Sequence, residues 1–148
     1  MVETAVVMST LTQEMIDQGA ALVRALEQDG VTVLAAFWFL NIETGRWRLF
    51  IGTPDVATTG WLELYQKARP LWKNLAACPG FDLGDVGIIA PRDPVFTLVS
   101  GLLVTGSDLV GRRFTNTASN GYPVDDVYVY KQTIEPPPPH WRRRRAKA

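Results

Sequence analysis

Apolar residues recur at helical spacing near the start of the chain. The repeat begins after Thr10, which has Gln13 three residues later in the form of a capping box, and it stops at Gly30. The pattern therefore predicts a helix over residues 11–29.

Two more segments have helical spacing. The first covers residues 59–75, where we expect a kink or a break at Pro70, because proline lacks the amide donor that a helix interior uses. The second begins at Asp93-Pro94, a capping residue followed by a first-turn proline, and stops at Gly106.

Between these helices lie segments rich in β-branched and aromatic residues. Asn120-Gly121 is a strong signal for a hairpin turn, because both residues accept a positive φ. The segments predict one central strand in a first hairpin, a short isolated strand and a second hairpin: residues 31–40, 46–52, 86–90, 111–117 and 122–133.

The order of elements is therefore α-β-β-α-β-α-β-β. Two hairpins and one further strand do not make a doubly wound parallel sheet, so we expect an α+β fold of a single two-layer domain. It should have a mostly antiparallel sheet of about five strands, with helices mainly on one face. The domain should span residues 1–135, followed by a flexible tail at 136–148 that is proline-rich and then arginine-rich.

The second strand indicates a covered and a more accessible side of the sheet. Trp47, Leu49 and Ile51 share one face, and the alternate positions share the other. The accessible side would carry the binding residues Phe37, Arg46, Arg48 and Phe50, joined by Phe39, Tyr128 and Tyr130. Such an apolar patch needs a cover, which could be a second copy of the chain or, equally, a loop, the first helix or the tail.

The length and composition are those of a globular domain, which excludes collagen-like, wholly disordered and disulfide-framework proteins. The 148 residues are 47% hydrophobic and 20% charged, and Lys plus Arg balance Asp plus Glu at 15 each. Residues 1–135 nevertheless hold ten basic and fifteen acidic residues, whereas the last nine residues add five positive charges. The longest nearly unbroken apolar run, residues 31–40, is about half of the ~20 residues that a membrane helix needs, so we expect a cytoplasmic protein without membrane contact.

The chain lacks most of the groups that common enzymes use. Its single histidine, His140, follows four prolines, and its single cysteine, Cys78, precedes a proline, so a catalytic pair or a zinc site is not expected. Phosphate-binding and dinucleotide-binding glycine motifs are absent from the sequence. We predict no metal, no cofactor and no catalytic residue, which favours a protein that is not an enzyme. The remaining route to catalysis would be carboxylates, tyrosines and arginines in a pocket that the sequence does not reveal.

Several polar and aromatic residues have structural interpretations. Asp82, Asp85, Asp125 and Asp126 fit turns and solvated positions better than a metal site, and Arg112 and Arg113 are expected to form salt bridges. Four tryptophans follow strand or helix periodicity and are predicted to lie in the core: Trp38, Trp47, Trp61 and Trp72.

The tail has its own physical character. Pro136–Pro139 favour a stiff extended rod of roughly 12 Å, at ~3.1 Å per residue. The residues beyond it, Trp141, Arg142, Arg143, Arg144 and Arg145, suit an acidic partner or the phosphates and bases of a nucleic acid. A solvated end without a partner is the simplest interpretation.

The chain also resembles a family of small uncharacterised bacterial proteins. The resemblance is carried by the opening helix at 11–26, by the strand Ala35-Ala36-Phe37-Trp38, by the hairpin Glu43–Leu49 and by the closing segments Arg113-Phe114 and 120–130. It implies a bacterial, cytosolic, single-domain protein and brings no activity, cofactor or catalytic residue with it. The extension from Pro136 to Ala148 is a departure from the usual short ending.

The sequence therefore favours a binding domain that associates with itself, as a homodimer, and contacts another protein. The alternatives are a nucleic-acid-binding accessory protein that uses its arginine-rich tail, and a small enzyme that uses Asp, Tyr and Arg side chains.

Overall fold

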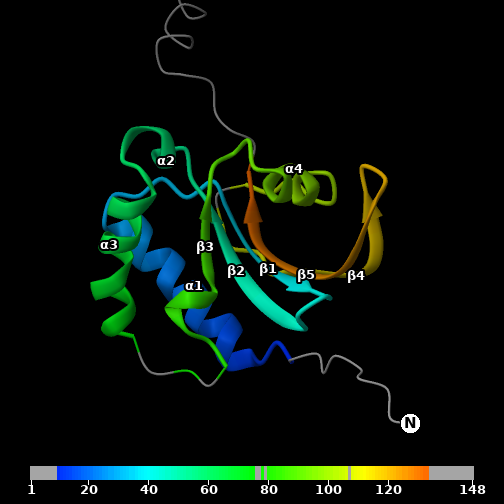
Figure 1. Cartoon of the computed structure of the whole chain (residues 1–148), viewed down its shortest axis with the longest axis horizontal. Coiled ribbons are helices and arrows are strands. Elements are labelled where there is room, and N and C mark those ends of the chain that lie inside the picture. The colour runs from blue at the N-terminus through cyan, green and yellow to red at the C-terminus, as the bar shows by residue number, and fades with distance from the viewer. Residues whose placement is uncertain (1–9, 76–77, 79, 107, 134–148) are drawn as a thin grey trace, which may run out of the picture.

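A computed structural model describes residues 10–75, 78, 80–106 and 108–133 of the chain. The elements follow the order that the sequence predicts (Figure 1), with two short helical segments added, one before the predicted second helix and one before the predicted isolated strand. In chain order they are α1 (Gln13–Gln28), β1 (Ala35–Asn41), β2 (Arg46–Gly52), α2 (Asp55–Thr58), α3 (Trp61–Lys73), η1 (Leu83–Asp85), β3 (Val86–Ile89), α4 (Pro94–Ser100), β4 (Arg112–Ser119) and β5 (Tyr122–Gln132).

The five strands form one open, mixed sheet in the order β3-β2-β1-β5-β4. β1 is central and antiparallel to both of its neighbours, as the apolar run at 31–40 indicates. β3 is parallel to β2, and the crossover between them contains α2 and α3. The predicted mixed α+β domain with a mostly antiparallel sheet is confirmed.

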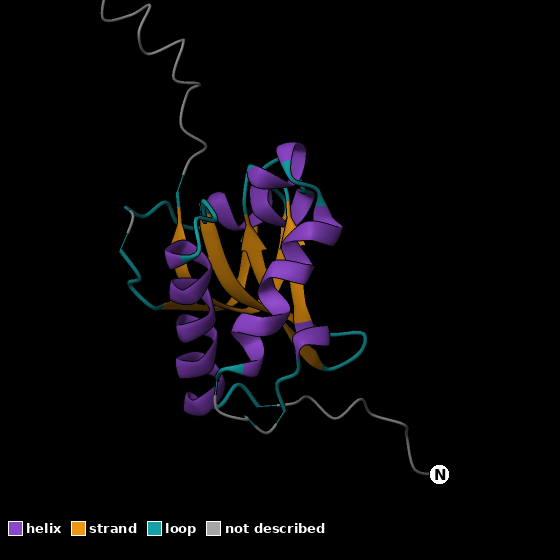
Figure 2. Ribbon diagram, turned by 90° about the vertical axis from the view of Figure 1, so that its left-hand side faces the viewer, coloured by secondary structure: helices purple, strands orange, loops and turns teal. Residues whose placement is uncertain are grey.

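Helices cover the two faces of the sheet unequally. α1 and α3 lie side by side over one face (Figure 2), where Trp38, Trp47 and Leu49 form the centre of the larger core. α4 lies on the opposite, concave face (Figure 1) and packs Phe96 and Val99 into a second, smaller core. Because α4 has only seven residues, it covers part of that face.

The predicted facing of two tyrosines is wrong. β5 pairs with β1 so that Tyr128 lies opposite Trp38, and Tyr128 and Tyr130 pack in the larger core, not on the accessible side expected for them. The pairing shifts between Ala36 and Phe37, so β5 is bulged next to Tyr130, and past the bulge Lys131 bonds to Glu27 of α1. The Tyr130 hydroxyl accepts a hydrogen bond from Trp38 Nε1 at 2.8 Å and donates one to the Ile16 carbonyl at 2.5 Å.

Three local predictions also need correction. α1 is capped by Thr12, not Thr10, because the Thr12 hydroxyl accepts from the Met15 amide. α3 continues through Pro70 without a break; this proline is exposed, and solvent can satisfy the carbonyl that loses its donor. α4 ends at Ser100, not near Gly106, because the chain beyond it bonds to β5, starting with the Thr105 amide on the Gln132 carbonyl at 2.7 Å.

The turn of the second hairpin has the geometry that the sequence predicts. Asn120 and Gly121 have φ values of 51° and 82°, as a tight turn between β4 and β5 requires. In the described part of the chain, no helix combines the length and the apolar character needed to cross a membrane.

Candidate functional site: two hollows joined by Arg48

Arg48 crosses the outer edge of the sheet. It projects from β2 on the concave face, where its guanidinium carbon lies 5.5 Å from the centre of the Phe50 ring. Its Nη2 donates to the Val86 carbonyl of the edge strand β3 at 3.4 Å. A Cβ atom at Gly87 would lie 2.9 Å from the Phe50 ring and 3.2 Å from Arg48 Nη2. The absence of a side chain at Gly87 therefore leaves the space through which Arg48 reaches the edge.

On the side of α3, Arg48 enters a hollow of about 560 Å³, here called the outer cleft. Arg69 and Gln66 project into it from α3, and Leu62 forms part of its apolar wall. Neither Arg48 nor Arg69 has a carboxylate partner among the described residues. The full lining is Arg48, Leu62, Tyr65, Gln66, Arg69, Leu83, Gly84 and Val86.

Tyr65 closes the edge of the sheet inside this cleft. Its hydroxyl accepts from the Ile88 amide at 3.0 Å and donates to the Val86 carbonyl at 2.8 Å. A neighbouring strand would bond to the same two backbone groups. The Tyr65 hydroxyl thus blocks the edge of β3, and another strand cannot add to β3 at this point without displacing it.

Besides the outer cleft, a neighbouring hollow of about 430 Å³ continues from Arg48 toward the turn of the first hairpin. Its acidic groups have partners: Asp85 accepts from Arg46 Nη2 at 2.7 Å and from the Asp82 amide at 3.0 Å. Asp82 and Asp85 also form the capping box of η1, in agreement with the predicted turn role. Among residues 10–75, 78, 80–106 and 108–133, three or more His, Cys, Asp or Glu side chains do not gather into a group that could hold a metal ion.

On the concave face, Arg48 also lines a smaller hollow of about 270 Å³, here called the inner pocket. Its apolar part includes Phe39 and Phe50, whose ring centres are 6.4 Å apart. Asp125 on β5 is its acidic residue. The full lining is Phe39, Leu40, Asn41, Ile42, Arg48, Phe50, Val95, Pro123 and Asp125.

The predicted binding residues are brought together only in part. Arg46, Arg48 and Phe50 do lie on the face predicted for them, with Arg46 and Arg48 exposed and Phe50 half-buried. Phe37 faces the same way, but it is fully buried in the core under α4, so its expected exposure is wrong. The tail residues Trp141 to Arg145 lie outside the described residues.

The start of α3 carries exposed apolar side chains that the sequence interpretation missed. Trp61 is 60% exposed and Leu62 is 72% exposed, so the prediction of a core position for Trp61 is wrong. Trp38 and Trp47 are buried as predicted, and Trp72 is half-buried against Phe81. Leu62, Gln66 and Arg69 are spaced as one helix face, and this pattern is the signal that could have located the outer cleft.

The prediction of salt bridges for two neighbouring arginines is confirmed for Arg113 and wrong for Arg112. Arg113 forms two hydrogen bonds with Asp126, at 2.9 and 2.7 Å, and these bonds raise the pKa of Arg113. Arg112 lies beside it on the edge strand, is exposed and forms no ion pair with a described residue. Burial and the nearby Glu14 raise the pKa of the Cys78 thiol, which lowers the share of thiolate at neutral pH.

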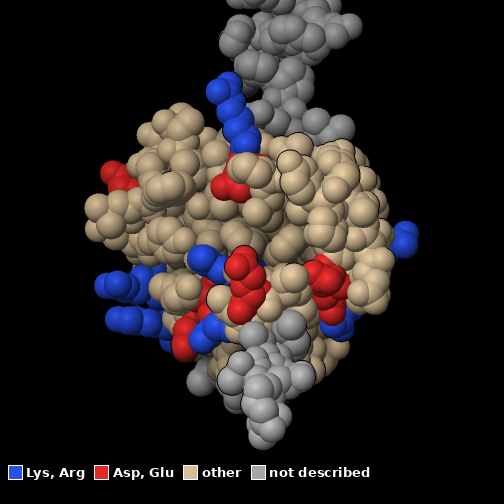
Figure 3. All heavy atoms as spheres, turned by 45° about the vertical axis from the view of Figure 1, so that its right-hand side comes forward, with Lys and Arg blue, Asp and Glu red and all other residues tan. Residues whose placement is uncertain are grey.

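Charges of both signs are interspersed on the face of the molecule that Figure 3 shows. Figure 3 shows acidic and basic side chains mixed across the lower half of one face, while the upper half is largely uncharged. Recognition on such a surface depends on individual charged groups more than on one extended field. Comparison of the chain with family models, curated proteins and solved structures gave no match.

Proposed function

We propose that this protein is a non-enzymatic binding domain that holds an acidic segment of another protein in the outer cleft. The observation that carries the proposal is the pair of arginines, Arg48 and Arg69, that line one cleft without a carboxylate partner in the described structure. An acidic side chain would supply the negative charge that neither guanidinium group has beside it, together with further hydrogen-bond acceptors.

The size and chemistry of the outer cleft suit a peptide side chain. Its volume of about 560 Å³ lies within the usual range for ligand sites, about 300–1,000 Å³. Gln66 adds an amide that can donate and accept hydrogen bonds, and Leu62 adds apolar surface. The cleft can therefore hold a carboxylate and the aliphatic groups beside it.

The exposed start of α3 favours a protein over a small metabolite. Trp61 and Leu62 extend the apolar surface from the rim of the cleft onto the outside of the helix. Tryptophan and arginine are the residues most enriched among energetically dominant interface positions. A partner that covers Trp61 while it places a carboxylate at Arg69 would use both features.

Selection of peptides on the full-length protein tests this proposal. The probe is a displayed library of random twelve-residue peptides, and the enriched sequences are synthesised and titrated by fluorescence polarisation. We expect Asp or Glu next to an apolar residue, and binding that weakens as salt rises from about 50 to about 500 mM. Arg69→Glu should weaken binding at least about tenfold, because it places like charges together.

Arg112→Glu is the matched control. Arg112 is exposed, belongs to β4 at the opposite edge of the sheet and forms no ion pair with a described residue, so the same charge reversal there should leave affinity within about twofold. Peptides without an acidic preference, or equal losses from Arg69→Glu and Arg112→Glu, would overturn the proposal.

A further inference from the structure

The rim of the inner pocket carries one positive and one negative charge that do not pair with each other. Arg48 lies on β2 and Asp125 on β5, with β1 between them, and no ion pair joins them or links either to another described residue. Their strands lie two spacings apart, roughly 10 Å, and Asp125 is a further two residues along β5 from Val127, which is level with Arg48. Each of these two side chains can therefore form an ion pair with a group on another molecule that covers this apolar surface.

The apolar part of this pocket also extends outward. Phe39 and Phe50 are half-buried at its floor, and Ile42 at its rim is 47% exposed. The volume of about 270 Å³ is below the range of about 300–1,000 Å³ usual for small-molecule sites, but it can admit one aliphatic side chain. The same surface thus offers both a recess and a protruding side chain.

Both edges of the sheet are unsuited to self-association. The Tyr65 hydroxyl occupies the backbone groups of β3, as described above. In β4, Asn116 has a φ of 48° and is skipped by the pairing, which runs from Thr115 with Asp126 to Thr117 with Val124. Such an irregularity disfavours the addition of another strand. Association of two copies by strand addition is therefore disfavoured, whereas the part of the concave face that α4 leaves uncovered stays available.

We propose that the inner pocket is the interface of a homodimer in which Arg48 of each copy pairs with Asp125 of the other. A two-fold axis places one patch against an identical patch, so a surface is self-complementary only if it carries both members of each contact. The inner pocket carries both charges, and it carries both the recess and the exposed Ile42 that can fill it. This inference goes beyond the ligand of the outer cleft and does not depend on it.

Charge reversal, measured by sedimentation velocity from about 1 to about 200 µM, tests the dimer. The wild-type chain should reach twice its mass of 16.4 kDa within this range. Arg48→Asp and Asp125→Arg each create two like-charge contacts in a symmetric dimer, so each should raise the dimer dissociation constant at least about tenfold. Glu63→Arg, an exposed position on α3, is the control and should leave the constant within about twofold.

An equimolar mixture of the two variants makes the test specific. A dimer with one R48D chain and one D125R chain has opposite charges at both contacts, so the mixture should regain the wild-type mass. Circular dichroism of each variant verifies that it is folded. A wild-type chain that stays monomeric at 200 µM, or folded variants whose mixture is as dissociated as each alone, would overturn the dimer.

The test of the dimer can fail or succeed independently of the test of peptide binding in the outer cleft. Asp125 does not line the outer cleft, so Asp125→Arg should dissociate the dimer while selected peptides still bind.

Discussion

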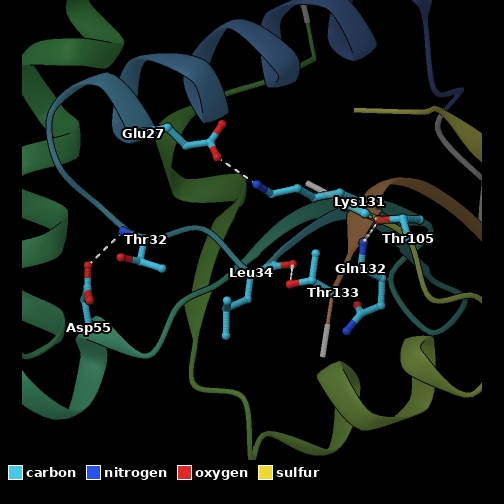
Figure 4. Close-up of polar contacts among 9 residues, drawn as sticks. Glu27, Thr32, Leu34, Asp55, Thr105, Lys131, Gln132 and Thr133 are labelled. Atoms are coloured by element: carbon cyan, nitrogen blue, oxygen red, sulfur yellow. Dashed lines mark hydrogen bonds and ion pairs between the residues drawn. The ribbon is translucent and has the colours of Figure 1, made fainter. Parts of the chain in front are cut away.

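Replacement of Gln132 by methionine should make the protein more stable. Gln132 lies at the end of β5, is 0% exposed and points toward α4 (Figure 4). Its backbone is fully used, since its amide donates to the Thr105 hydroxyl and its carbonyl accepts from the Thr105 amide. Its side-chain amide, by contrast, has no hydrogen-bond partner among the described residues at either the oxygen or the nitrogen.

The expected gain in stability comes from removing the cost of burying that amide. A buried amide without hydrogen bonds destabilises a folded protein by about 1–3 kcal/mol on scales derived from mutation. Methionine has a similar length and volume, is flexible and carries no strong hydrogen-bonding group, so it should fill the same space without this cost. Gln132→Met should therefore raise the free energy of unfolding by about 1–3 kcal/mol. For a chain of this length the melting temperature should rise by roughly 3–9 °C.

Urea unfolding followed by circular dichroism measures the change. Gln28→Met is the matched control, because Gln28 is an exposed residue of α1 and its substitution should change stability by less than about 0.5 kcal/mol. A loss of more than about 1 kcal/mol in Gln132→Met would refute the reasoning, since it would mean that the amide is satisfied in solution by a buried water or by another group.

The contact between Tyr130 and α1 yields three further predictions. Tyr130→Phe should lower the free energy of unfolding by about 1–3 kcal/mol, because it leaves the Trp38 indole N–H without its partner; urea unfolding measures this loss. Burial raises the pKa of Tyr130 far above its ordinary value, so above pH ~10 the unfolded chain releases a proton that the folded chain keeps. Stability should then fall with rising pH by up to about 1.4 kcal/mol per pH unit, and this slope should be smaller in Tyr130→Phe. Gly19→Ala, normally favourable in a helix, should destabilise by about 1–3 kcal/mol, because its Cβ would overlap the Tyr130 hydroxyl; the loss should shrink when Tyr130→Phe is also present.

Much of the fold could be predicted because local signals and burial agree. The Asn120-Gly121 turn has the positive φ values that its residues favour, and the alternation of Trp47, Leu49 and Ile51 identifies the face of β2 that α1 and α3 cover. Asp93 caps α4 through the Val95 amide, as the Asp-Pro pair indicates. In each case the residues that decide the conformation are close together in the sequence.

Predictions failed where a distant contact decides the outcome. Tyr128 and Tyr130 face the larger core because the register of β5 on β1 sets Tyr128 opposite Trp38, and a pattern within one strand does not reveal the register between two strands. α4 ends early because Thr105 bonds to Gln132, 27 residues further along the chain. Trp61 fits a helical repeat, but the face that α3 buries is set by Leu64 and Ala68, which leave Trp61 in solvent.

The candidate site was predictable only in its residue types. Alternation placed Arg46, Arg48 and Phe50 on one face, yet it could not show that Gly87 of a different strand lets Arg48 pass over the sheet edge. Nor could it show that Arg69 and Asp125 line hollows on either side of Arg48, because both depend on the packing of separate elements.

The position of Arg48 couples the two proposed binding events. One guanidinium lines both the outer cleft and the inner pocket, and it cannot give its full set of hydrogen bonds to a carboxylate in each at once. An acidic peptide in the outer cleft should therefore weaken the dimer, and by thermodynamic linkage the dimer should weaken peptide binding by the same factor. Titration of a selected peptide into the wild-type protein should shift the sedimentation profile toward the monomer. In Asp125→Arg, where the dimer contact is already lost, the peptide should bind more tightly than it does to the wild type. If instead the peptide leaves the dimer unchanged, the two sites do not compete for Arg48, and Arg69 alone serves the outer cleft.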